Sequence, residues 1–173
     1  MTGWKEADLV GPDGDDWRVP VSELAARQHR LGELLAAAGI PGAFIQHPVD
    51  LYYYAGGRQN ASMYIPSLAA EEKRSILFVR RSLQRALFEG GGTDAPHEVV
   101  SFPRSAELVD TLRQRGVVSA PGLQYGEVPA TFAQRFANIF VELGTCPDVT
   151  SIIHGQREVK SQWEIEQMDA AAD

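Results

Sequence analysis

The sequence predicts a three-layer α/β domain with a mixed central sheet covered by helices. Three observations support this prediction. Short apolar runs alternate with segments of helical periodicity, the connections between them are short, and 44% of the 173 residues are hydrophobic, enough for a sizeable core. We expect a polar lead-in over residues 1–20, the α/β domain over residues 21–156 and the start of a further helix over residues 157–173.

Helical periodicity marks several segments before residue 157. Helices are expected over residues 22–38, 80–88, 106–115 and 132–143. In the last of these, Phe132, Phe136 and Phe140 share one face, so we expect all three to be mostly buried. A glycine that can end the helix follows three of the four segments, at Gly39, Gly116 and Gly144.

Short apolar runs mark the expected strands. Their centres lie near Phe44, Leu77, Val100, Tyr125 and Ile152, in the runs 43–45, 76–79, 99–102, 123–128 and 149–153. Residues 50–54 are expected to form a short helical or extended segment. After Gly56 and Gly57, residues up to Pro66 are expected to form a loop.

The final helix carries a recognisable start signal. Ser161 and Glu164 have the spacing of a capping box, in which each side chain accepts a hydrogen bond from a free amide of the first turn. No glycine or proline interrupts residues 166–173. Two interpretations remain open: the helix continues into a longer protein, or it is a C-terminal helix that frays into solvent.

Composition excludes several classes of partner. The formal charge of −7 and the pI near 5.1 disfavour binding to a phosphate backbone, so we expect no nucleic-acid partner. No apolar run is long enough to cross a membrane, and the start of the sequence lacks a signal-peptide core. A cytoplasmic location is therefore expected. The single cysteine, Cys146, fits a reducing compartment, but it also fits many exported proteins.

The sequence lacks the common catalytic patterns. Its histidines, at positions 29, 47, 97 and 154, are not at metal-ligand spacing. The glycines at 90–92 lack the lysine and hydroxyl residue of a phosphate loop, and no Gly-x-Ser-x-Gly elbow occurs. We therefore expect no catalytic residue, no cofactor and no metal site within this chain.

The segment from Asp50 to Pro66 has the most unusual composition. It combines four tyrosines with an arginine and an asparagine beside two glycines, and these residue types anchor interfaces and bind anionic or planar groups. Arg58, Asn60 and Tyr64 are the candidate substrate-binding residues. The alternative is that the tyrosines pack under the sheet and that Arg58 pairs with a surface acid.

Three motifs in order resemble one family. They are Arg27, Leu31, Leu35 and Gly39 in the first helix, then Pro48, Asp50, Tyr53 and Gly56, and finally Arg157, Lys160, Glu164 and Ile165. Together they resemble the N-terminal domain of the creatinase, prolidase and aminopeptidase P superfamily. The resemblance covers nearly the whole chain from Val21 onward, and it implies a ribonuclease-H-like α/β fold whose last helix links to a catalytic domain.

The resemblance also implies a division of labour. In this family a following catalytic domain holds two divalent metal ions (Mn, Co or Zn) with two Asp, one His and two Glu, and activates a bridging water. The N-terminal domain helps to form a homodimer and can place a loop, here Gly56 to Pro66, over the partner subunit's active site. The expected function is thus the non-catalytic domain of an Xaa-Pro aminopeptidase or dipeptidase acting on a peptide or small-molecule substrate. A domain of a creatine amidinohydrolase, a lyase or a metal-free protein-binding module is the alternative.

Overall fold

The computed structural model describes residues 16–70 and 74–172 of the chain. The expected polar lead-in over residues 1–20 therefore lies largely outside the described residues. The helices are α1 (Val21–Ala37), α2 (Pro48–Ala55), α3 (Leu83–Glu89), α4 (Leu108–Arg113), α5 (Ala130–Ile139), α6 (Thr150–Glu158) and α7 (Gln162–Ala172). The strands are β1 (Gly42–Ile45), β2 (Ala61–Pro66), β3 (Ser75–Val79) and β4 (His97–Ser101).

The sheet is mixed and has the order β1-β2-β3-β4. The first three strands pair antiparallel, with Phe44 opposite Tyr64 and Tyr64 opposite Ile76. Strands β3 and β4 run parallel, and α3 makes the crossover between them. This arrangement confirms the predicted α/β class with a mixed sheet flanked by helices.

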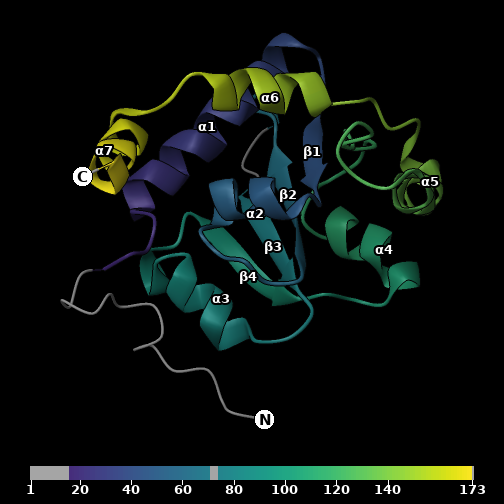
Figure 1. Cartoon of the computed structure of the whole chain (residues 1–173). Helices are drawn as coiled ribbons and strands as arrows, with labels where there is room; N and C mark the ends of the chain where they lie inside the picture. The colour runs from purple at the N-terminus through teal and green to yellow at the C-terminus, as the bar shows by residue number, and fades with distance from the viewer. Residues whose placement is uncertain (1–15, 71–73, 173) are drawn as a thin grey trace.

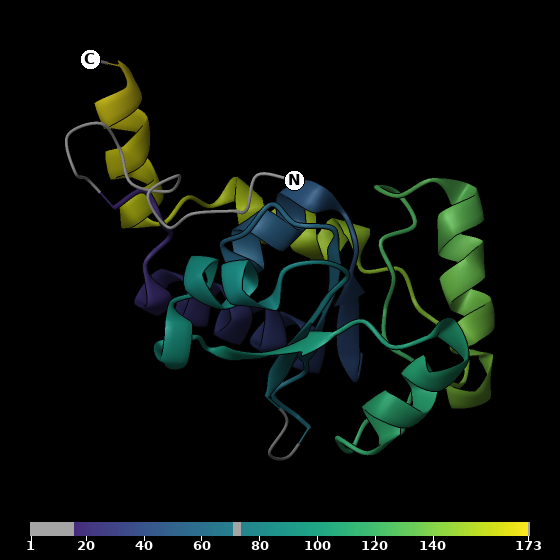
Figure 2. The ribbon, with the colours of Figure 1, turned by 90° about the horizontal axis from the view of Figure 1, so that it is seen from below.

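Strand alternation gives the sheet two buried faces, each covered by helices (Figures 1 and 2). On one face Ile45 and Met63 pack with residues of α1, α2 and α6, such as Leu31. On the other face Phe44 and Phe78 pack with residues of α4 and α5. The expected burial of the α5 phenylalanines holds for Phe136 and Phe140, whereas Phe132 is only partly buried because it lies at the helix start near the edge of the core.

Two expected strands are wrong. Residues 149–153 contain β-branched residues typical of a strand, but they form the start of helix α6. Val149 and Ile153 are four residues apart, the spacing of one helical face, and both are buried. Asp148 accepts a hydrogen bond from the Thr150 amide at 2.9 Å, which favours a helix start. The 123–128 run makes only an isolated bridge at Leu123 before the chain turns at Gln124.

The expected loop over Gly56–Pro66 is also partly wrong. Residues 61–66 form strand β2 at the middle of the sheet, and the connection covers only residues 56–60. Gly56 ends α2 with φ of +76°, and a Cβ there would lie 2.8 Å from the carbonyl oxygen of Glu89. The turn before β2 therefore requires a glycine. The expectation that Ser161 and Glu164 cap the last helix is confirmed, since the amide of each donates to the other's side chain, at 3.1 and 3.2 Å.

A buried histidine joins β4 to α1. The His97 side chain is 2% exposed, its Nδ1 lies 3.1 Å from Gln28 Nε2, and its Nε2 has no hydrogen-bond partner in the described part of the chain. Because the Gln28 amide nitrogen can only donate, Nδ1 accepts and the ring is neutral with its hydrogen on Nε2. Burial, together with the nearby positive charge of Arg74, lowers the pKa of His97 to about 4.

We predict that His97 makes the free energy of unfolding depend on pH. An unfolded histidine takes up its proton near pH 6.5, whereas folded His97 remains neutral down to about pH 4. In this window the unfolded state binds more protons, so the free energy of unfolding falls as pH falls, by about 2 kcal/mol between pH 7 and pH 5. Urea melts at both pH values should show this loss in the native chain. His97→Gln should abolish it and His29→Gln, an exposed position, should retain it; an equal loss in all three chains contradicts the assignment.

Candidate functional site

Two of the three predicted binding residues lie together on the connection between α2 and β2. Arg58 and Asn60 are both exposed. The Arg58 guanidinium carbon lies 5.1 Å from the ring centroid of Tyr52, a cation–π arrangement that fixes the arginine without neutralising it. No carboxylate pairs with Arg58 within residues 16–70 and 74–172. Its charge is therefore available to an anionic group.

Tyr64, the third predicted residue, lies elsewhere. It is 1% exposed on strand β2 and packs in the same cluster as Phe44, with its hydroxyl 3.5 Å from the carbonyl oxygen of Pro41. Burial raises the pKa of Tyr64 to about 12. The pleat of β2 turns this side chain into the core, so it does not share a surface with Arg58 and Asn60.

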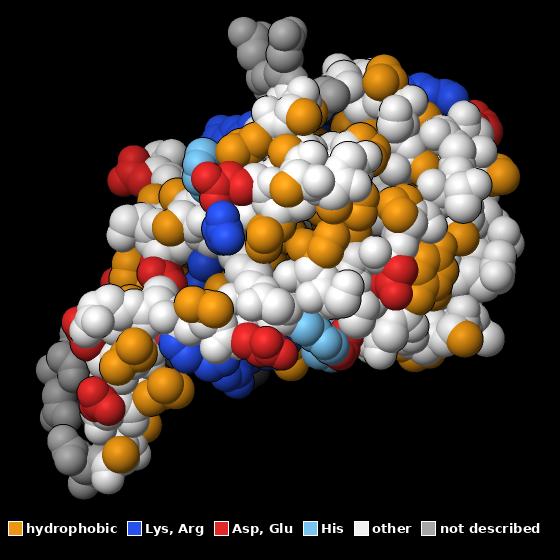
Figure 3. Space-filling model, turned by 90° about the horizontal axis from the view of Figure 1, so that it is seen from above, with side chains coloured by type: hydrophobic (Ala, Val, Ile, Leu, Met, Phe, Trp, Pro, Cys, Tyr) orange, Lys and Arg blue, Asp and Glu red, His pale blue; other side chains and the backbone are white. Residues whose placement is uncertain are grey.

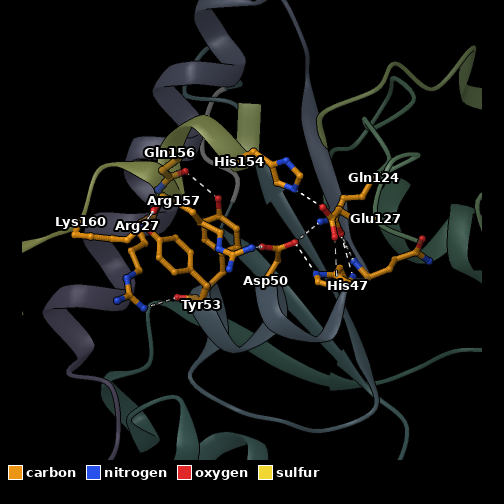
Figure 4. A network of polar contacts seen from close by, with 12 residues as sticks. Arg27, His47, Asp50, Tyr53, Gln124, Glu127, His154, Gln156, Arg157 and Lys160 are labelled. Carbon is orange, nitrogen blue, oxygen red and sulfur yellow. Dashed lines mark hydrogen bonds and ion pairs between the residues drawn. The ribbon is translucent and has the colours of Figure 1, made fainter. Parts of the chain in front are cut away.

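A buried carboxylate joins two of the sequence motifs (Figure 4). Asp50 on α2 is 0% exposed, and its Oδ1 accepts a hydrogen bond from Arg157 Nη1 on α6 at 2.9 Å. Its Oδ2 lies 3.1 Å from His47 Nδ1 and accepts a hydrogen bond from Gln124 Nε2 at 2.6 Å. Each carboxylate oxygen thus has a polar partner, which offsets the cost of burying the group.

The network continues through Gln124 and Glu127. Gln124 Oε1 accepts hydrogen bonds from the backbone amides of Gln46 and His47, at 2.8 and 3.1 Å. Glu127 lies between two histidines: one carboxylate oxygen is 3.5 Å from His47 Nε2, and the other pairs with His154 Nε2 (Figure 4). These contacts hold the 124–127 turn against the end of β1 and the side of α6.

A second set of contacts anchors the start of α7. Arg27 on α1 is buried, and its guanidinium donates to Glu23 Oε1 and to the carbonyl oxygen of Tyr53, both at 2.9 Å, while lying 4.1 Å from the Tyr53 ring centroid. Glu23 Oε1 also accepts from the Ser161 hydroxyl at 2.6 Å, and Arg27 Nη2 is 3.6 Å from Glu164 Oε1. The capping box of α7 is therefore bound to α1.

Gln156 connects the same region to α2. Its Oε1 accepts from the Tyr54 hydroxyl at 2.8 Å, and its Nε2 donates to the carbonyl oxygen of Arg27 at 2.9 Å. Burial raises the pKa of Tyr54, so its hydroxyl remains a donor. Helices α1, α2 and α6 are thus joined by polar contacts as well as by the core.

A groove of about 420 Å³ lies between α2, α6 and α7. Its walls include Tyr52, Trp163 and Met168, with Arg157 and Lys160 on α6 and the turn after it. A neighbouring hollow of about 530 Å³ runs between α1 and α6. In the view from above, α7 projects from the rest of the molecule and carries hydrophobic side chains on its visible side (Figure 3). None of its described residues is buried.

The described residues do not fit a metal centre. Within residues 16–70 and 74–172, no group of three or more His, Cys, Asp or Glu side chains is placed to hold a metal ion. The pair of divalent ions that the sequence resemblance implies therefore finds no ligand set in this part of the chain. Among the same residues, no helix combines the length and the apolar character needed to cross a membrane.

The sequence profile of the Creatinase/Prolidase N-terminal domain matches residues 27–159. The chain belongs to this family. The three motifs of the creatinase/prolidase N-terminal domain thus meet in space: Arg27 contacts Glu164, and Asp50 contacts Arg157. No curated protein sequence matches the chain closely.

Solved structures share the fold of this creatinase/prolidase N-terminal domain. An Xaa-Pro aminopeptidase from Streptococcus thermophilus superposes with a TM-score of 0.62 at 15% identity, over 78% of this chain and 98% of that one. Dipeptidase PepE from Mycobacterium ulcerans gives 0.66 at 19% identity over 86% of this chain, and the prolidase from Pyrococcus furiosus gives 0.60 at 19% over 79%. The domain spans only 40% and 39% of these last two chains.

Sequence reasoning missed part of the network. Asp50 and Arg157 were visible as members of two motifs, although their contact was not. Gln124 and Glu127 carried no spacing signal, because they follow a short apolar run that was interpreted as a strand. Gln156 was missed for the same reason: a helix over residues 150–158 would have placed it one turn after Ile153, on the buried face.

Proposed function

We propose that this chain is the non-catalytic N-terminal domain of an Xaa-Pro-type metallopeptidase, and that it contributes to a homodimer and to the partner subunit's substrate pocket. The match to the Creatinase/Prolidase N-terminal domain is the observation that carries the proposal. The structural neighbours are named as an aminopeptidase, a dipeptidase and a prolidase, which favours a peptidase over the other reactions of the superfamily. The two metal ions would be held by a catalytic domain outside these residues.

The helix α7 supports an attachment to another domain. Ile165 and Met168 are 39% and 52% exposed, whereas the first turn of the helix is fixed to α1 by Glu23 and Arg27. An anchored start and an exposed apolar side suit a helix that packs against a catalytic domain of the same protein. The cytoplasmic location belongs to the same proposal, as does the dimer.

Arg58 is the residue through which the domain would act on substrate. It is exposed, it has no acidic partner in the described part of the chain, and Tyr52 fixes its orientation. A guanidinium can hold both oxygens of a substrate carboxylate at once. Asn60, two residues away and also exposed, could add a neutral hydrogen bond to the same substrate.

The test uses the full-length protein and Xaa-Pro dipeptides. Arg58→Ala should lower kcat/KM by about tenfold or more, because it removes a charge-assisted contact, while folding and dimer mass stay unchanged. Arg104→Ala is the matched control, since Arg104 is an exposed arginine already paired with Glu107. Tyr64→Phe should leave kinetics unchanged.

A mixed dimer tests the action across the interface. One subunit carries Arg58→Ala and an intact catalytic domain, and the other carries native Arg58 and lacks a metal ligand. If Arg58 serves the partner, this mixed dimer has its working active site beside the native Arg58 and keeps full activity at that site. Kinetics as poor as those of the Arg58→Ala homodimer would place the arginine in its own subunit's site, and native kinetics in the homodimer would leave the loop without a substrate role.

A further inference from the structure

Two arginines that have no acidic partner among the described residues lie over the connection that follows β4. Eight of the 13 arginines pair with a carboxylate; within the described residues Arg80 and Arg135 do not, and neither do Arg58, Arg74 and Arg81. The Arg80 guanidinium carbon lies 3.7 Å from the ring centroid of Phe102, and Arg135 Nη2 on α5 donates to the Ser105 hydroxyl at 3.0 Å. Phe102 and Ser105 are three residues apart, so both cationic groups gather over one short segment.

The segment under the arginines is well anchored. The Phe102 amide donates to the Val79 carbonyl oxygen at 2.9 Å, and its ring packs edge-on against Phe78 with centroids 5.9 Å apart. Ser105 begins the short 3-10 turn Ser105–Glu107 that leads into α4. Arg80 therefore stacks on a ring that the core holds in place, and its planar fork is pre-oriented for binding.

The two positive charges oppose each other. Burial, followed by the charge of Arg135, lowers the pKa of Arg80, and no carboxylate among the described residues offsets this cost. An anion between them would remove the repulsion and would gain charge-assisted hydrogen bonds from both.

The location is one where α/β domains bind ligands. Arg80 follows the carboxyl end of β3, and Phe102 follows that of β4 (Figure 1). Gln46 follows the carboxyl end of β1 on the same face of the sheet as Phe44, given the strand alternation. Its side chain is 6% exposed, yet neither its amide nitrogen nor its amide oxygen has a partner within the described residues. A buried amide without partners is costly, and this one lies at the same carboxyl edge of the sheet as Arg80 and Phe102.

We propose that Arg80 and Arg135 form a binding site for an oxyanion, a carboxylate or phosphate group, above residues 102–105. The site uses neither the Arg58 nor the Asn60 side chain, although the Arg80 amide donates to the Asn60 carbonyl oxygen at 3.1 Å, and it does not depend on the proposed peptidase function. Its chemistry suits a small ligand whose anionic end sits between the two guanidinium groups.

The test is a titration of the isotope-labelled 173-residue chain followed by NMR. Inorganic phosphate and sodium acetate are the probes, with ionic strength held constant by chloride. Saturating shifts are expected at the Nε–H groups of Arg80 and Arg135 and at the backbone amides of residues 102–105. Arg80→Gln and Arg135→Gln should each weaken the binding by about tenfold or more, since each removes one bidentate contact.

Arg104→Gln is the matched control, because Arg104 lies in the same connection but is neutralised by Glu107. It should leave the dissociation constant within about twofold of the native value, a difference of less than 0.5 kcal/mol. Saturation by phosphate alone or by acetate alone identifies the oxyanion and supports the site. Shifts that never saturate with either probe, or that persist in the Arg80→Gln/Arg135→Gln double variant, overturn it. Arg135 is exposed on α5, so its single variant tests the proposal even if Arg80→Gln perturbs folding.

Discussion

Replacing Phe136 with alanine should lower the free energy of unfolding by about 3–5 kcal/mol, because it deletes a large side chain from a filled core. Phe136 is 1% exposed and lies at the centre of an aromatic cluster. Its ring centroid is 5.4 Å from that of Phe44 on β1, 5.1 Å from Phe132 and 6.2 Å from Phe140. The helix and the sheet cannot both move inward to fill the space, so the cavity persists.

Urea denaturation followed by circular dichroism measures the loss, with two comparison variants. Phe132→Ala should cost less, since Phe132 is only partly buried at the start of the same helix. Phe136→Leu should cost less than about 2 kcal/mol because it retains most of the volume. A loss below about 1 kcal/mol for Phe136→Ala would mean that α5 does not form the second layer of this core.

The parts of the fold that local pattern determines could be predicted from the sequence. Helices α1 and α5 have apolar residues at helical spacing, although α5 ends at Ile139 and a 3-10 turn over Val141–Leu143 separates it from the expected stop at Gly144. Strands β1 and β3 are short apolar runs between turn residues, and β4 contains the apolar pair Val99 and Val100. In these segments local preference and burial favour the same structure. The mixed sheet was predicted from the alternation of apolar runs with helical segments. The family resemblance predicted the ribonuclease-H-like fold.

The errors arose where tertiary contacts overrule local preference. The 149–153 run is rich in β-branched residues, yet the chain pairs as a strand only just before it, in the isolated bridge between Leu123 and Asp148. As a helix it buries Val149 and Ile153 against α1 and α2 instead. Strand β2 was misjudged because its serine and tyrosine suggest a surface loop, whereas a central strand buries both its faces and so buries Tyr64 as well.

The candidate site was predictable only in part for a similar reason. Arg58 and Asn60 follow a glycine pair, which indicates an exposed turn, and they are exposed. The Asp50–Arg157 contact joins residues 107 positions apart, and no local pattern encodes such a pairing. Motif membership identified both residues, but only the packing of α6 on α2 brings them together.

Replacing Asp50 with alanine should cost about 3–5 kcal/mol of unfolding free energy, because it leaves buried donors without an acceptor. The Gln124 amide nitrogen would lose a 2.6 Å hydrogen bond, and Arg157 and His47 would lose the carboxylate they share. Asp50→Asn should cost less, since one amide oxygen can still accept, but its NH₂ group would face a donor.

A double-mutant cycle separates the ion pair from the rest of the network. Arg157→Met retains the aliphatic packing and removes the charge, and combined with Asp50→Ala it should cost less than the sum of the two single changes, by roughly 1–3 kcal/mol. Asp110→Ala is the control, because the Asp110–Arg113 pair is exposed and 3.4 Å long, and it should change stability by less than about 1 kcal/mol. Additive costs for Asp50 and Arg157 would mean that Gln124, rather than Arg157, is the partner that keeps the buried carboxylate in place.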